Sequence, residues 1–289
     1  METTLLFKTM VILTSQLFIV YMTGYYCILK ARQAYKNNTT FLDLRFKGSV
    51  NMKGKLDLIP YFYKDTFPKR MSIEVMKKNK WGADVKSLEY KYANNQDEVI
   101  ELLREGYEHA ETNYKLVKIV AFNAVASFGA LACISFFDLG ILLGMTFFTL
   151  TSLSLGAILG IIFLEMDEND GFAALKITIS ITLITGFIGY SDFISFSESK
   201  AFGAVLMLCL LGLIIFNLSR SFMEMSRSTV KVGAIFGSIL FTLFLLYDFN
   251  YIAKQENALN NWTSAVEMAY ILYLDIINLL LEILEAMNN

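Results

Sequence analysis

The chain has 289 residues, of which 55% are hydrophobic and 18% are charged, and its formal net charge is −2. This composition is too apolar and too weakly charged for a soluble domain. The near-neutral charge also excludes the strongly basic surface of a dedicated nucleic-acid-binding protein. Three cysteines lie far apart in apolar stretches, which excludes a disulfide framework or a spaced zinc site, and the single histidine argues against histidine-based catalysis.

Long apolar blocks alternate with short polar stretches, and a helix needs about 20 apolar residues to cross the hydrocarbon core of a bilayer. No small-residue cleavage site follows the first block, so we interpret it as a retained anchor rather than a signal peptide. The predicted fold class is an all-α, multi-pass integral membrane protein. Its seven transmembrane helices are predicted at 9–29, 116–137, 139–163, 172–190, 201–218, 230–251 and 264–284.

A polar, partly basic segment at residues 30–114 separates the first two spans. Residues 36–91 carry 13 Lys/Arg against 6 Asp/Glu. Two interpretations stand at this point: a solvated basic surface, or a surface attracted to anionic lipid headgroups. The positive-inside rule favours an orientation with this basic side and the C-terminus in the cytosol and the N-terminus outside, and the topology stays open.

The same segment carries signals of secondary structure. Three stretches alternate or cluster like short strands, at 41–50, 55–63 and 70–78. From Asn95 the pattern has a helical period with acids in the first turn, which predicts a helix that includes His109 and continues into the second span. We therefore divide the chain into a first transmembrane helix at 1–29, a small α+β insertion at 30–114 and a six-helix transmembrane bundle at 115–289.

Two aspartates interrupt the apolar blocks near the C-terminus. Asp275 lies 11 residues into the last predicted span, or roughly 16 Å, which is close to the bilayer midplane. Asn278 and Glu282 follow at i+3 and i+7 on the same helix face. Asp248 lies near the end of the preceding span, on the side of the membrane from which the last span begins. The two aspartates are therefore expected to meet.

Two carboxyl groups in contact inside a bilayer cannot both be ionised cheaply, so they share a proton. A shared proton would hold the two helices together, and its loss would separate them or admit a cation. Calcium prefers carboxylate and carbonyl oxygens, so Asp248 and Asp275 are the candidate pH sensor and transient calcium site, with Asn278 and Glu282 as helpers. The alternative is that both aspartates are buried polar groups that hydrogen-bond backbone carbonyls.

Small residues within the spans have a structural interpretation. The glycines of 139–163, and Gly233, Gly237 and Ser238 in 230–251, allow helices to approach closely. We expect them to be packing sites rather than hinges.

The two aspartate-bearing stretches, LFLLYDFNYI at 243–252 and ILYLDIINLLLEIL at 271–284, resemble the transmembrane Bax inhibitor motif family. The similarity covers the tyrosine–aspartate pair and the leucine–aspartate–x–isoleucine–asparagine–leucine core. FTLTSLSLG at 148–156 is also similar, as are the number and order of spans. The segment 30–114 is not covered, because the members of this family have a short connection there.

The resemblance implies a seven-helix fold with the last helix at its centre. It also implies a pH-sensitive calcium leak in which Asp248 and Asp275 form the sensor, and a role in calcium homeostasis or the suppression of cell death. Some bacterial relatives hold an aspartate with an arginine near the end of the second span, but ISFFDL at 134–139 offers none. The expected partners are the lipid bilayer, calcium and protons, with a protein or anionic lipid at 30–114. No cofactor is expected besides calcium as the permeant ion.

Two other function classes were weighed. Two aspartates on neighbouring helices also describe intramembrane aspartyl proteases, but Leu272, Tyr273 and Leu274 stand where those enzymes have glycine-x-glycine, and no proline follows Pro68. We therefore predict that the chain is not an enzyme. The remaining alternative is a non-conducting interaction protein that modulates a protease or cell death through 30–114, with the bundle as its anchor.

Overall fold

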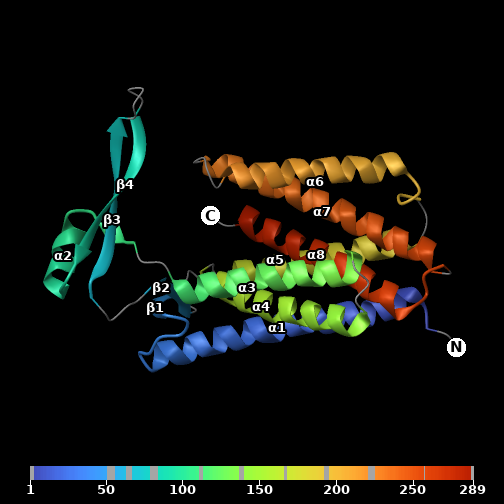
Figure 1. The fold of residues 1–289 in the computed structure, drawn as a ribbon, viewed down its shortest axis with the longest axis horizontal. Coiled ribbons are helices and arrows are strands. Elements are labelled where there is room, and N and C mark those ends of the chain that lie inside the picture. The colour runs from blue at the N-terminus through green and yellow to red at the C-terminus, as the bar shows by residue number, and fades with distance from the viewer. Residues whose placement is uncertain are drawn as a thin grey trace. The chain divides into compact units, whose positions relative to one another are not determined.

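The computed structural model describes residues 3–50, 56–62, 67–78, 84–110, 113–136, 140–165, 168–191, 195–220, 225–256 and 258–287. Figure 1 shows the elements that they form. The helices are α1 (Leu5–Lys36), α2 (Gln96–Arg104), α3 (Tyr114–Leu131), α4 (Ile141–Glu165), α5 (Glu168–Tyr190), α6 (Lys200–Arg220), α7 (Arg227–Gln255) and α8 (Trp262–Met287), with a π-helical turn at Ala132–Phe136. The strands are β1 (Leu44–Val50), β2 (Leu56–Phe62), β3 (Lys69–Lys78), β4 (Asp84–Ala93) and β5 (Glu108–His109).

Seven helices in the described residues are long and apolar enough to cross a membrane, namely α1 and α3 to α8. They coincide with the seven predicted spans. The prediction of an all-α, multi-pass integral membrane protein with a small insertion of strands is therefore confirmed.

The chain divides into two compact units. The first, which we call the bundle unit, comprises Met1–Ile28 and Val120–Asn289. The second, the small unit, is Leu29–Ile119 and contains all five strands given above together with α2.

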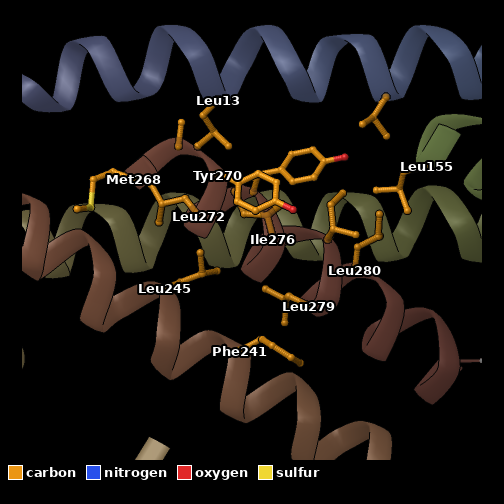
Figure 2. Packing of buried hydrophobic residues seen from close by; sticks show 14 of the residues in the cluster. Leu13, Leu155, Phe241, Leu245, Met268, Tyr270, Leu272, Ile276, Leu279 and Leu280 are labelled. Atoms are coloured by element: carbon orange, nitrogen blue, oxygen red, sulfur yellow. The ribbon is translucent and has the colours of Figure 1, made fainter. Parts of the chain in front are cut away.

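Helix α8 lies at the centre of the bundle unit. Of its most apolar stretch 67% is buried, against 11% in α6, and Figure 1 shows α8 in the middle of the bundle and α6 at its edge. Figure 2 shows the core around α8, where Leu272, Ile276 and Leu279 meet side chains of the neighbouring helices. Leu13 of α1, Leu155 of α4 and Leu245 of α7 belong to the same buried cluster. Its greater burial makes α8 the helix best suited to hold polar groups away from lipid.

Glycines set the distance between α1 and α4. A Cβ added at Gly156 would lie 2.5 Å from the Val20 carbonyl oxygen, and one at Gly160 would lie 2.8 Å from the Gly24 carbonyl oxygen. Backbone oxygens of a helix cannot move aside, so the two helices approach this closely only because both positions lack a side chain. The prediction that the glycines of 139–163 are close-packing sites is confirmed here.

The small unit contains two sheets. Strands β1 and β2 form an antiparallel pair, and a second sheet has the strand order β4–β3–β5. Helix α2 contributes Val99 and Leu102 to a core that also holds Met71, Ala93 and Tyr107. The three predicted strands correspond to β1, β2 and β3, whereas β4 was not predicted.

The predicted helix from Asn95 is correct at its start and wrong at its end. The side-chain oxygen of Asn95 caps α2 by accepting a hydrogen bond of 2.9 Å from the Glu98 backbone nitrogen. The helix does not continue into the second span, because Gly106 takes a left-handed conformation with a φ of +89° and turns the chain back. His109 therefore lies in β5, where it pairs with Met71 of β3, and not on a helix.

Candidate functional site

The α7–α8 contact brings the two predicted aspartates together. The carboxyl groups of Asp248 and Asp275 hydrogen-bond each other. Asp248 lies seven residues before the end of α7 at Gln255, and Asp275 lies thirteen residues after the start of α8 at Trp262. Their contact thus requires the two helices to be offset along their axes by roughly 9 Å.

A hydrogen bond between two carboxyl groups requires a proton on at least one of them. Ionised carboxylates only accept hydrogen bonds, so two of them are linked only when at least one carries a proton. Asp275 is 8% exposed, and neither aspartate forms an ion pair with a basic residue of the described chain. A proton shared between the two carboxyl groups would link this pair.

Each carboxyl group of the pair has one oxygen without a partner. The Oδ2 atoms of Asp248 and Asp275 are buried and make no hydrogen bond within the described residues. An acceptor buried without a donor is costly, so such atoms mark a place where a further proton, a water molecule or a cation would be stabilised.

Aromatic contacts fix α8 on the side facing α3 and α4. The rings of Tyr270 and Tyr273 meet Phe148 of α4 edge-on, with ring centroids 5.0 and 4.9 Å apart. The Tyr270 hydroxyl donates to the Ser127 carbonyl of α3 at 3.0 Å, and the Tyr273 hydroxyl lies beside Ser152 of α4. The FTLTSLSLG stretch at 148–156 is therefore the surface on which the aspartate-bearing helix rests.

Asn250 holds α7 on the opposite side, two residues after Asp248. It is fully buried. Its amide donates to the Gly189 carbonyl at 3.0 Å, while its oxygen accepts from the backbone nitrogen and hydroxyl of Ser197 at 2.9 and 2.8 Å. Asn250 was not predicted as a site residue, although a polar side chain inside the apolar stretch 243–252 is the same signal that identifies Asp248.

The two predicted helpers do not join the aspartate pair. Asn278 is partly exposed and forms no hydrogen bond within the described residues. Glu282 instead hydrogen-bonds Asn217 of α6, and its carboxyl group packs on α7, where a Cβ at Gly237 would lie 2.5 Å from the Glu282 Cδ atom. One helical turn further, Glu285 forms an ion pair with Arg220. We call Glu282, Glu285, Asn217 and Arg220 the outer cluster.

A comparison with protein families identifies the group to which these residues belong. The family model Bax1-I, described as inhibitor of apoptosis-promoting Bax1, matches residues 107–289. The chain belongs to the Bax inhibitor-like transmembrane family. A search of curated proteins finds no match.

The family match confirms the resemblance read from the C-terminal motifs, and it contains both aspartates. It begins at Tyr107, so α1 and most of the small unit lie outside it. This Bax inhibitor family member therefore joins a family bundle of helices α3 to α8 to an N-terminal part that the family does not describe.

The pair alone would be a sparse metal site. In the described residues, no group of three or more His, Cys, Asp or Glu side chains gathers in a way that could hold a metal ion. Two carboxylates offer at most four oxygens, whereas calcium takes about six to eight. Any cation at Asp248 and Asp275 would have to keep part of its water shell.

Proposed function

We propose that this Bax inhibitor family member is a pH-sensitive calcium leak channel, in which Asp248 and Asp275 are the sensor, and that it serves calcium homeostasis or the suppression of cell death. The observation that carries the proposal is the hydrogen bond between two carboxyl groups on the central helix and its neighbour. Because this bond needs a proton, its strength depends on pH at a contact of the most deeply buried span, α8.

The protonated pair is the closed state of the proposed channel. One shared proton links α7 to α8, and the buried Oδ2 atoms face no cation. When the proton leaves, two anions lie side by side in a medium of low dielectric, where their repulsion is far stronger than in water. The helices then separate at this point or take up a cation, so the leak rises as the pH rises.

Calcium is the cation whose chemistry suits the deprotonated pair. It favours carboxylate oxygens, and its coordination geometry is flexible. Because the pair supplies too few oxygens to strip the ion of water, calcium would be held weakly. Weak binding is what conduction requires, since an ion that is held tightly does not leave.

The test is calcium flux into dye-loaded proteoliposomes from about pH 6 to about pH 8. Wild type should leak faster at the higher pH, whereas Asp275→Asn and Asp248→Asn should each leak at a rate that no longer depends on pH, because one carboxylate beside an uncharged amide has no second anion to repel it. Glu198→Gln is the matched control, since Glu198 is an exposed carboxylate paired with Lys254. Absence of flux at every pH from inserted wild-type protein would overturn the proposal.

The second candidate is a non-conducting interaction protein that acts through residues 30–114. The compact small unit with its own core favours it. Asn113 donates to the Leu42 carbonyl at 2.8 Å and Lys115 bonds to Asp43 at 2.7 Å, so a short linker can replace residues 44–112 between two points that already touch. Under this candidate the replacement abolishes function and Asp275→Asn is harmless; the leak channel predicts the reverse.

Proteolysis is the remote alternative, because aspartyl proteases also share one proton between two aspartates. We propose no catalytic role here, since Leu272 and Leu274 replace the glycines that would leave room for a substrate backbone beside Asp275. Incubation with fluorescent membrane-spanning peptides should give no cleavage from protein that shows the pH-dependent leak. Cleavage that is lost in Asp275→Asn would establish the protease instead.

A further inference from the structure

Strand β4 has an unpaired edge. In the strand order β4–β3–β5 it lies on the outside, and its ten residues pair with β3 along their whole length. No other strand of the described chain pairs with its second side. The backbone N–H and C=O groups along such an edge are a template for adding another strand.

Three side chains of β4 form a largely exposed face, on which the Arg70 guanidinium of β3 lies 3.8 Å from the centroid of the Tyr90 ring. Leu88, Tyr90 and Tyr92 lie on one face of the sheet and are 52%, 42% and 60% exposed. Glu89 and Lys91 alternate with them and lie on the opposite face, the one that carries Met71 and Ala93 of the core. The edge thus presents apolar groups on one face and opposite charges on the other.

We propose that β4 pairs with β4 of a second copy of this chain, in an antiparallel register centred on Tyr90. In this register Glu89 lies opposite Lys91 of the second copy, and the two-fold symmetry repeats the pair. Leu88 lies opposite Tyr92 twice, and Tyr90 lies opposite Tyr90. Opposite charges and apolar groups that face each other directly stabilise a strand pair.

Neighbouring registers lack this complementarity. Residues that lie opposite each other in an antiparallel pair point to the same face of the sheet. The exposed faces of the two copies therefore lie on the same side of the joined sheet only if the two-fold axis passes through a residue of β4 and not between two residues. Centring on Glu89 or on Lys91 places like charges opposite each other, which is unfavourable. Centring on Leu88 places Glu89 opposite Ser87 and pairs no charges. Of these registers, only the one centred on Tyr90 places opposite charges opposite each other on one face and apolar side chains opposite each other on the other face.

Two further features favour the pairing. Lys91 hydrogen-bonds Glu105 at 3.0 Å, which raises the pKa of the lysine, and its side chain is still 50% exposed. It therefore remains charged and accessible to a second carboxylate. The small unit is also continuous with the candidate membrane spans α1 and α3. Confinement to a membrane raises the effective concentration of two copies, so a short strand pair suffices.

Disulfide crosslinking of the full chain in proteoliposomes at low protein density tests the register. In a background where the three cysteines are replaced by serine, Tyr90→Cys should form a covalent dimer on mild oxidation, because paired residues bring their Cα atoms to about 4.5–5.5 Å. Ser72→Cys is the matched control. Ser72 pairs with Tyr90 within one copy, so two such cysteines would lie three strands, or about 14 Å, apart.

Charge reversal tests the interface independently of Tyr90. Using mixed copies of Leu88→Cys and Tyr92→Cys as the reporter, Glu89→Lys should lower the crosslinked fraction severalfold, and adding Lys91→Glu should restore it. Equal crosslinking of Tyr90→Cys and Ser72→Cys, or none from either reporter in protein that is folded and thiol-accessible, would overturn the proposal. Neither result bears on the proposed calcium leak, because the leak is tested separately by calcium flux.

Discussion

Helix α8 carries two carboxyl sites that differ in their surroundings. Asp275 faces Asp248 with no cation in the described chain to compensate it, whereas Glu282 and Glu285 share the outer cluster with Arg220 and Asn217. The two sites are seven residues apart, or about 10 Å along the helix. The same helix therefore carries one acid pair without a neighbouring cation and a second group of acids beside an arginine.

This difference is the reason why the proposed leak assigns the pH response to Asp248 and Asp275 rather than to the outer cluster. An arginine stays protonated at any physiological pH, so the outer cluster keeps its ion pair throughout. We call Asp248 and Asp275 the inner pair. In the proposed leak, the inner pair changes its charge only by losing a proton, and this loss replaces a hydrogen bond with a repulsion between two carboxylates. In the proposed leak, the acids that matter are therefore the two that lack a compensating cation, Asp248 and Asp275.

The largest expected effect is non-additivity at the inner pair. If one proton is shared, Asp248→Asn and Asp275→Asn each remove the whole pH response, and the double variant removes nothing more. The open fraction of a gate controlled by one proton changes by up to about tenfold per pH unit on the acidic side of its midpoint and by less near the midpoint. This change should be absent in all three variants. The measurement is proteoliposome flux at several pH values.

Retention of half the response in each single variant would show that the aspartates titrate independently. The difference between the two sites of α8 would then not rest on proton sharing. Glu285→Gln serves as the control on the same helix and should keep the full pH response.

A smaller effect is expected from alanine substitutions at two glycines, Gly189, which packs against α7, and Gly237, which packs against Glu282 of the outer cluster. A methyl group at Gly189 would lie 2.7 Å from the Leu246 carbonyl oxygen and 2.9 Å from the Phe249 Cβ atom, close to Asp248. Backbone cannot yield, so Gly189→Ala should lower the free energy of unfolding by about 1–3 kcal/mol. At Gly237 the obstacle is the flexible end of Glu282, which can swing away.

For Gly237→Ala, the gain in helix propensity of up to about 1 kcal/mol offsets the remaining crowding. Thermal unfolding of the detergent-solubilised variants should therefore show a clear loss for Gly189→Ala and almost none for Gly237→Ala. The calcium flux should also be altered more in Gly189→Ala than in Gly237→Ala, because only Gly189→Ala displaces α7 close to Asp248. Equal loss in both variants would mean that Glu282 is held as rigidly as backbone.

The inner pair was predictable because a charge inside an apolar block is a strong signal. Asp248 and Asp275 stand out from their neighbours in any hydropathy scan, and the hairpin connection of α7 to α8 puts them at the same contact. The seven spans were predictable for the same reason, since length and apolarity alone define them.

The outer cluster and the small unit were less accessible to sequence reasoning. Glu282 shares a helix face with Asp275, yet helix crossing directs it to α6 and Gly237, which periodicity does not reveal. The end of α2 depended on the left-handed conformation of Gly106, a local event within an otherwise helical pattern. Strand β4 was missed because its partner β3, not its own composition, defines it.

The smallest expected effect concerns the ion pair of the outer cluster. Arg220 and Glu285 keep 41% and 29% of their side-chain surface exposed, so the pair should contribute no more than about 1 kcal/mol to stability. Glu285→Gln removes one acid and leaves Arg220 near Glu282, whereas Arg220→Met leaves two carboxylates without a cation. Arg220→Met should therefore lower the stability more than Glu285→Gln does, and the double variant should recover part of the loss.

Unfolding midpoints at low and high salt would measure this difference in stability. Added salt screens the repulsion between the two carboxylates and should bring the midpoints of the two single variants closer together. The pH response of the leak should survive in all three, since none of them touches the proton between Asp248 and Asp275.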